Sequence, residues 1–275
     1  MRRIVLAMMM AGTVQGAQAA DYPEDLPILR GSFRDGLSTR VTRWQGFYVG
    51  GQAAYGSSDH NFTGATSDMT RQQLALTTIE NEFNISGWPV IGGKVSHQSS
   101  AFGGFAGYNS QWSDTVLGVD ASYMHGNFSG GKSGSMGRQF VTSDGISNDV
   151  TVTSAASIKF TDVLTLRGRA GYAIGSFLPY LFGGVAFGLA DTSRSNRIDA
   201  SGTTGTPPTP AYGPVTYIAS ENQHGRLKVG YTMGLGTEVM LFGNVFGRAE
   251  WEYIRFTGPI DTNINTVRGG LGYRF

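Results

Sequence analysis

Apolar and polar side chains alternate with a period of two over a long stretch of this chain. The odd positions from Leu227 to Leu241 are mostly apolar, whereas the even positions from Arg226 to Met240 are mostly charged, polar or glycine. An α-helix, with its 3.6-residue repeat, would scatter the two sets around its surface, but a strand places them on opposite faces. The pattern therefore predicts a two-faced strand and argues against a helix.

Seven further segments follow the same alternation or approach it: 47–56, 102–112, 116–126, 164–172, 179–189, 245–254 and 267–275. The segment 179–189 is apolar on both faces, so the alternation does not assign its sides. Strand patterns of this length, repeated along a chain and separated by turn residues, indicate an all-β fold.

The connections between these segments alternate in length. Short links fall near 113–115, 175–178 and 242–244, and long ones at 57–100, about 129–153 and 190–225, with a link of intermediate length at 257–264. Short turns on one side and long loops on the other are typical of outer-membrane barrels. We therefore predict an eight-stranded antiparallel up-and-down transmembrane β-barrel over 46–275, with long extracellular loops and both termini on the periplasmic, short-turn side.

Two of the long loops have a character of their own. Residues 71–85 could form a short helix inside the first loop. The tract Gly202–Pro210 is rich in glycine, threonine and proline and has almost nothing to bury, so we expect it to be mobile.

The N-terminus has the layout of a secretory signal peptide. Two arginines precede the apolar run Ile4–Val14, and the small residues Ala17 and Ala19 mark a cleavage site, with cleavage expected after Ala19. The run is too short to span a bilayer as a helix, which needs ~20 residues. We predict a signal peptide over 1–19, export to the outer membrane, and an N-terminal periplasmic segment over 20–45 outside the main fold.

Composition excludes several classes of protein. The 21 basic and 20 acidic residues leave a net charge of +1, and without Arg2 and Arg3 the balance becomes 19 against 20, which is no footprint for nucleic acid. Because cysteine is absent, there is no disulfide scaffold, thiol nucleophile or cysteine-based metal site. The chain has 41 glycines and only 15% charged residues, with a mean hydropathy of −0.14, which is unusual for a soluble enzyme.

Alternation alone does not say which face points inward. A soluble barrel keeps its apolar face inside, whereas a membrane barrel presents it to lipid and lines its interior with the polar face. Aromatic residues near the segment ends and the mixed signs of the polar face favour the membrane arrangement, because charges in a packed interior must be paired. The predicted interior charge network consists of Asp120, Arg167, Arg169, Glu238, Arg248, Glu250, Glu252, Arg268 and Arg274.

One charged residue does not fit the predicted lipid-facing side. Asp162 falls on the same parity as Leu164 and Leu166. Either the strand contains a bulge at this point, or Asp162 lies in the outer interface, where a lipid-facing charge is less unfavourable than at the bilayer midplane.

Several stretches, in this order, resemble a known family: Gly46–Gly51, Gly104–Asn109, Leu166–Tyr172, Pro179–Ala186 and Val267–Phe275. Over about residues 46–275 the chain resembles the small alphaproteobacterial outer-membrane β-barrel proteins, the RopB-like porin-family group within the wider OmpA-like transmembrane barrels. The resemblance implies a structural role in the envelope. It also implies that Phe275, with Leu271 and Tyr273 on the same face, serves as a signal for the outer-membrane assembly machinery.

The function favoured by these observations is structural. Eight strands leave an interior just wide enough for side chains, so the charge network would close the barrel, and the protein would support the envelope and display its loops. Its expected partners are outer-membrane lipid, lipopolysaccharide and the assembly machinery. A small passive pore, with water between the same charged residues, is the alternative.

Enzymatic activity is not expected, and neither are cofactors or metals. Of the four histidines, three lie in predicted loops. His125, near the end of a strand, lies close in sequence to Ser122 and Asp120, but it points to the opposite face of the strand. A last possibility is adhesion to an unknown surface partner through the long loops, which carry the aromatic residues Trp88, Phe83 and Phe140.

Overall fold

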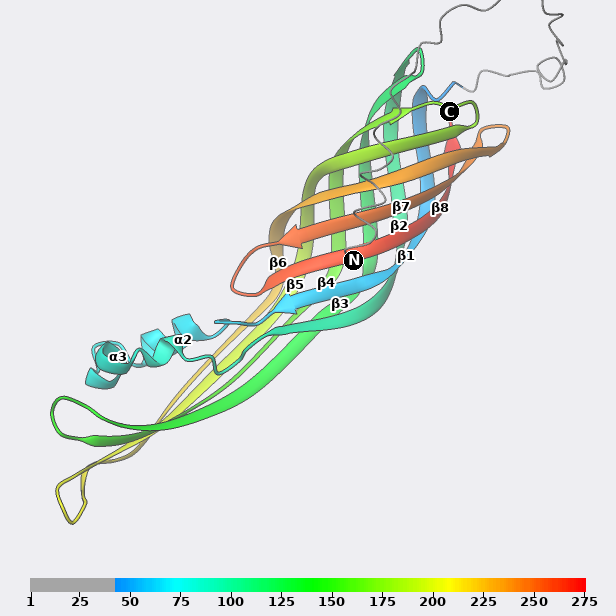
Figure 1. Cartoon of the computed structure of the whole chain (residues 1–275). Helices are drawn as coiled ribbons and strands as arrows, with labels where there is room; N and C mark the ends of the chain where they lie inside the picture. The colour runs from blue at the N-terminus through cyan, green and yellow to red at the C-terminus, as the bar shows by residue number, and fades with distance from the viewer. Residues whose placement is uncertain (1–42) are drawn as a thin grey trace, which may run out of the picture. The chain divides into compact units, whose positions relative to one another are not determined.

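The computed structural model describes residues 43–275, which form a closed ring of eight antiparallel strands (Figure 1). Each strand pairs with its neighbours in the chain, and the last strand pairs with the first, which confirms the predicted eight-stranded barrel. The strands are β1 (Gly46–Asn61), β2 (Lys94–Trp112), β3 (Thr115–Val141), β4 (Ser147–Tyr172), β5 (Phe177–Thr204), β6 (Thr209–Phe242), β7 (Val245–Phe256) and β8 (Asp261–Arg274). The predicted signal peptide over 1–19 lies outside the described residues.

Four strands continue well beyond the ring. Pairing of β2 with β3 stops at Ala101 and Gly126, and pairing of β6 with β7 stops at Gly230 and Phe256. Beyond those points β3 to β6 run on as a four-stranded sheet, seen at the lower left of Figure 1. We call this sheet, residues 127–160 and 190–229, together with the connection 62–93, the extension.

The prediction of long loops is therefore wrong for two of the three segments. Most of 129–153 and 190–225 is strand, and the connections are only 142–146 and 205–208. The tract 202–210 forms the ends of β5 and β6 and the turn between them, where mobility was expected. The physical reason is that Val150, Val152 and Ile198 alternate with polar residues and are fully buried, so these strands do have an apolar face to cover.

The remaining long connection, 62–93, covers that apolar face. It contains α2 (Ser67–Gln73), α3 (Thr78–Phe83) and the short 3-10 helix η2 (Ile85–Gly87), where the sequence suggested one helix over 71–85. Leu74, Ile85 and Trp88 from this connection pack on the inward-facing side chains of β4 and β5. No helix among residues 43–275 is both long enough and apolar enough to cross a bilayer.

Within the ring, the two faces of each strand differ as the alternation predicts. Leu117, Leu166, Leu235, Trp251 and Leu271 point outward and are 41–61% exposed. The charged residues between them point into the ring and are buried. The structure also settles the sides of 179–189, because its even positions, from Tyr180 to Ala186, contain the buried side chains, and its odd positions point outward.

Both explanations offered for Asp162, a strand bulge and a position at the edge of the apolar band, apply. The register of β4 against β5 shifts between Phe160 and Asp162, which marks a bulge. The side chain points outward, and its carboxylate accepts hydrogen bonds from the Tyr123 hydroxyl at 2.6 Å and from His125 Nδ1 at 2.9 Å. The bulge thus moves the strand out of its alternation where the apolar outer band ends.

The interior of the ring is filled in three layers. The layer nearest the short turns is apolar and contains Phe105, Leu178 and Phe246. The middle layer contains the charged residues. The third layer, nearest the extension, is apolar again and contains the stacked pair Phe160 and Phe256, whose ring centroids are 4.7 Å apart.

Trp44 belongs to the first of these layers. Of the predicted N-terminal segment 20–45, the structure describes only residues 43–45, and Trp44 is 1% exposed. Its indole nitrogen donates to the Gly175 carbonyl at 3.3 Å, and its backbone nitrogen donates to Gln111 Oε1 at 2.6 Å. Trp44, two residues before β1, therefore closes the end of the ring at which the short turns lie.

His60 is buried at the opposite end, between the third layer and the extension. It is 0% exposed, and its nitrogens contact Thr262 Oγ1 at 2.9 Å and Ser58 Oγ at 3.2 Å. Gly130 makes room for the imidazole, because a Cβ there would come within 2.5 Å of Cδ2. Burial lowers the pKa of His60 from 6.5 to about 4.

We therefore expect acid to weaken the folded protein through His60. Between about pH 6.5 and pH 4 the unfolded chain binds a proton at this residue that the folded protein does not, so the contribution of neutral His60 is complete above pH 6.5 and lost as the pH falls through this window. Urea unfolding in lipid vesicles at pH 7.5, 6 and 5 measures the loss. The variant His60→Gln should show a smaller decline than the wild type. His224→Gln, at an exposed position, should show the wild-type decline. Equal declines in all three proteins would contradict the assignment.

Candidate functional site: the interior charge layer

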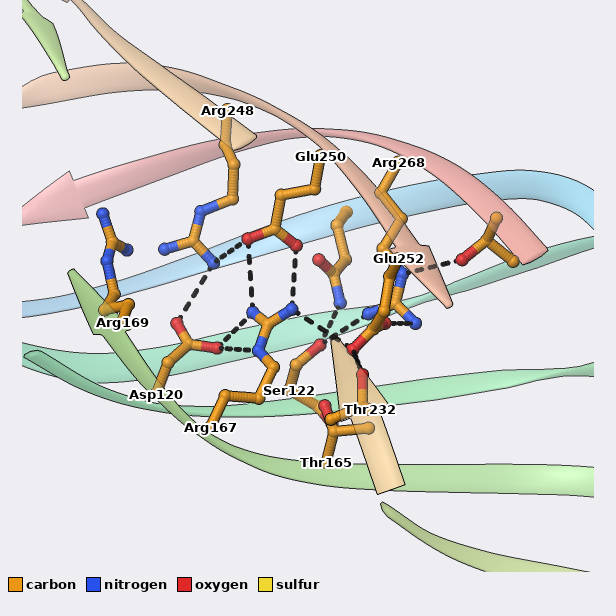
Figure 2. Close-up of polar contacts among 12 residues, drawn as sticks. Asp120, Ser122, Thr165, Arg167, Arg169, Thr232, Arg248, Glu250, Glu252 and Arg268 are labelled. Atoms are coloured by element: carbon orange, nitrogen blue, oxygen red, sulfur yellow. Dashed lines mark hydrogen bonds and ion pairs between the residues drawn. The ribbon is translucent and has the colours of Figure 1, made fainter. Parts of the chain in front are cut away.

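Eight charged side chains meet in the middle layer of the ring, and Figure 2 labels all of them except Glu238. Because alternate residues of a strand point to the same face, the spacing of two along each strand brings them all inward. The acids are Asp120 on β3, Glu238 on β6 and Glu250 and Glu252 on β7, and the bases are Arg167 and Arg169 on β4, Arg248 on β7 and Arg268 on β8. None is more than 5% exposed, and four carboxylates balance four guanidinium groups.

Arg167 is the centre of the first half of the layer. Its Nε lies 3.0 Å from Asp120 Oδ1, and its Nη1 lies 3.0 Å from Glu250 Oε2 and 3.4 Å from Glu252 Oε1. One guanidinium group therefore joins carboxylates from β3 and β7, across the ring. Such charge-assisted bonds are roughly twice as strong as neutral ones.

Arg248 links that group to the second half. Its Nη1 lies 3.1 Å from Asp120 Oδ2, and its Nε lies 2.9 Å from Glu238 Oε1. The same oxygen of Glu238 accepts a bond from Arg169 Nη1 at 2.8 Å. Asp120 and Glu238 are thus each shared between two arginines, and the network is continuous.

Neutral polar side chains complete the layer toward the extension. Arg268 pairs with Glu252 and also donates to Ser122 Oγ at 3.1 Å. Thr232 Oγ1 donates to Glu252 Oε1 at 2.6 Å, and Gln52 Nε2 donates to Ser122 Oγ at 2.7 Å. The bond from Thr232 occupies a lone pair of the buried Glu252 carboxylate, and Ser122 accepts bonds from both Arg268 and Gln52.

Aromatic rings cover the arginines on the side of the short turns. The guanidinium carbon of Arg248 lies 3.7 Å from the Phe105 ring centroid, and that of Arg169 lies 3.9 Å from the Tyr180 centroid. Tyr180 also donates its hydroxyl to Glu250 Oε1 at 2.7 Å. Aromatic faces attract cations, most strongly where water is excluded.

Sequence reasoning missed these aromatic residues as members of the site. Tyr48 is a second example, because its hydroxyl donates to Asp120 Oδ2 at 2.8 Å. The segments that contain Tyr48 and Tyr180 alternate weakly, so their inward positions are not evident from composition. Glycines occur at both parities in these segments, at 50 and 51 and at 183 and 184, so no sequence signal assigns the two tyrosines to the interior.

Arg274 was predicted as part of this network and does not join it. It lies at the end of β8, is only partly buried, and pairs with no acid among residues 43–275. The remaining eight predicted residues are brought together. The three residues of the predicted assembly signal, Leu271, Tyr273 and Phe275, point outward and are 46–72% exposed.

The serine, histidine and acid considered for catalysis do not meet. Asp120 and Ser122 lie inside the ring, whereas His125 lies on its outer surface and pairs with Asp162. Within residues 43–275 no group of three or more His, Asp or Glu side chains has an arrangement that could hold a metal ion. The carboxylates and guanidinium groups of the layer pair with one another.

The layer should make a measurable contribution to stability. Replacing one member, as in Asp120→Asn or Arg167→Gln, leaves its partners buried and unpaired, and breaking a buried pair typically lowers the free energy of unfolding by about 3–5 kcal/mol. The double variant should lose less than the sum of the single losses, because it removes both partners of one pair. Urea unfolding in lipid vesicles gives these values.

The exposed ion pair between Arg197 and Asp199 supplies the matched control. Both side chains are 39% exposed or more, so Asp199→Asn should change the free energy of unfolding by less than about 1 kcal/mol. Losses of similar size in Asp120→Asn and Asp199→Asn would show that the interior is wet and the charges are screened.

Known proteins with related sequences are described as outer-membrane proteins. The 25 kDa outer-membrane immunogenic protein of Brucella ovis is 25% identical over 183 residues, which cover 66% of this chain and 67% of that protein. The protein of the same description from Brucella canis is 24% identical over 195 residues, covering 66% and 69%.

The chain is also similar to solved structures of outer-membrane proteins. The outer membrane protein OprG from Pseudomonas aeruginosa matches 84% of this chain and 96% of its own, with 14% identity and a TM-score of 0.36. Ail, the attachment invasion locus protein of Yersinia pestis, matches 84% of this chain and 99% of its own, with 15% identity and a TM-score of 0.31. The family described as the outer membrane protein beta-barrel domain matches residues 4–275, and the chain therefore belongs to this family of outer-membrane β-barrel proteins.

Proposed function

We propose that this protein is a structural barrel of the outer membrane. Its closed interior gives a rigid wall that contributes to envelope integrity, and its extension is the part displayed at the cell surface. The observation that carries the proposal is the neutral charge layer, in which eight side chains no more than 5% exposed are enclosed between two apolar layers. A fold used for conduction would need water in that position.

The orientation follows from the asymmetry of the barrel. The short turns and Trp44 face the periplasm in this proposal, and the extension faces outward, as short periplasmic turns and larger extracellular parts are usual in the outer membrane. The outward row of Leu271, Tyr273 and Phe275 is accessible to the assembly machinery before the barrel closes, which supports its role as an assembly signal.

A passive pore is the second candidate, and the layers count against it. Ions would have to pass the contact of Arg167 with Asp120 and then the stacked rings of Phe160 and Phe256. The open channels of porins have 16–18 strands, against eight here. We also propose no catalytic role, because the side chains considered for one lie on opposite faces of the wall.

We also propose adhesion through the extension as a secondary role. The aromatic residues noted in the sequence are used for internal packing, since Phe83 stacks on Phe140 at 4.1 Å and Trp88 is only 8% exposed. Apolar side chains that stay exposed on the extension include Leu76, at 96%, Ile218, at 72%, and Val141, at 61%. A surface partner would meet these residues and not the aromatic cluster.

Planar-bilayer recording tests the closed interior. We expect the purified, folded wild type to give no steady openings, because the charge layer and both apolar layers block the axis. A variant with Asp120, Arg167 and Glu250 all changed to alanine should, if it folds, show more current than the wild type. Large, steady openings in the wild type would establish the pore and overturn the structural proposal.

A further inference from the structure

The outer surface of the barrel changes from apolar to polar at one height along the barrel axis. On β4 the outward positions run from Leu164 through Asp162 to Lys159, and on β5 they run from Leu189 to Asp191 and Ser193. This is the height at which the apolar band ends. The outer face of the extension therefore continues the lipid-facing wall directly above the hydrocarbon.

Irregularities in strand pairing occur at the same height. Register shifts occur between His125 and Phe128 on β3, between Phe160 and Asp162 on β4, and between Ala190 and Thr192 on β5. Bulges bend a strand and re-aim its side chains. The extension begins at this bend (Figure 1).

A hollow of about 560 Å³ lies just above the bend, on the outer face. Its floor is made of the small residues Gly131, Ser157 and Ser193 from β3, β4 and β5, and its edge includes Lys159, His97 and His224. A second hollow of about 520 Å³ shares the same three floor residues and continues toward the tip. We call the two hollows together the trough.

The groups along the trough suit a phosphorylated sugar. Lys159 lies opposite Asp191 in the pairing of β4 with β5. It forms no ion pair with this or any other acid among residues 43–275, so its ammonium group is available to an anion. The one acid at the edge, Asp191, is engaged by the Gly225 backbone nitrogen at 2.8 Å and by His224 Nδ1 at 3.7 Å. Serine hydroxyls both donate and accept hydrogen bonds, as sugar hydroxyls require.

We propose that the trough binds the phosphorylated sugar headgroup of the outer-leaflet glycolipid, with Lys159 on a phosphate and the serine floor beneath the sugar. The continuity of the trough with the lipid-facing wall selects this occupant, because the headgroups of lipids packed on Leu164 and Leu189 lie at this height. The proposal rests on the outer-membrane location of the chain and not on the closed interior, so conductance and binding can fail independently.

Binding to the folded full-length protein in detergent micelles tests the proposal. The probes are lipopolysaccharide with phosphorylated lipid A and inner core, the same lipopolysaccharide after removal of its phosphates, and inorganic phosphate. We expect the phosphorylated form to bind at least about tenfold more tightly than either other probe, since bonds to charged groups exceed neutral ones. Equal affinity for the dephosphorylated form, or for inorganic phosphate, would overturn the proposal.

Two variants locate the binding in the trough by independent means. Lys159→Gln removes the charge, and Ser157→Leu fills the floor, and each should weaken binding of the phosphorylated probe about tenfold. Arg197→Gln makes the same change of charge on the same outer face nearer the tip, where Arg197 pairs with Asp199, and should bind as the wild type does. Heat-modified gel mobility confirms that each variant is folded. Wild-type binding by both trough variants would place the glycolipid elsewhere and refute the inference.

Discussion

Opposite demands on the two faces of each strand govern this molecule. A strand in a single-walled barrel has lipid on one side and the barrel interior on the other, and neither side offers free water to a buried charge. The outward face must therefore be apolar, and every charge on the inward face must find a partner, since an isolated buried ion costs several kcal/mol. The four carboxylates and four guanidinium groups of the middle layer meet that requirement, and the apolar layers on either side keep them dry.

The extension follows a different rule. Beyond Gly126 and Gly230 the sheet has lost its outer neighbours β2 and β7, so its inward face must be covered by something other than a closed ring. The connection 62–93 supplies that cover by placing Leu74 and Ile85 on Val150 and Ile198. The outward face lies above the hydrocarbon and is free to be polar, which is why small hydroxylic residues replace leucine there.

The sequence was informative where alternation was strict. Around Arg167 and Glu250 the two faces differ in every residue, so the interior charges were predictable by counting. The segment 179–189 was not, because a strand with apolar residues on both faces contains no parity signal. Trp44 and Tyr48 were missed for a related reason: an aromatic residue near the start of a strand is equally suited to an interfacial girdle and to the interior.

The error on the long loops has a physical origin as well. The segments 129–153 and 190–225 are rich in serine, threonine and glycine, a composition that resembles loops and also suits strands outside the hydrocarbon. Their inward faces contain the buried polar residues Ser154, Arg194 and Asn196 between apolar ones such as Val152 and Ile198, which weakens the alternation that would reveal a strand. Arg274 was placed in the network by parity alone, but parity does not give height along the barrel axis.

Three of the four tryptophans allow a direct test of a barrel with an apolar outer face and a closed interior. Trp112 and Trp251 point outward and are 59% and 41% exposed, whereas Trp44 is 1% exposed inside the turn end. In single-tryptophan variants folded into vesicles, we expect brominated acyl chains to quench the fluorescence of Trp112 and Trp251, and we expect Trp44 to resist both these lipids and aqueous iodide. Strong iodide quenching of Trp44 would show an open, water-filled interior, and iodide quenching of Trp251 without quenching by brominated lipid would show that the faces are reversed.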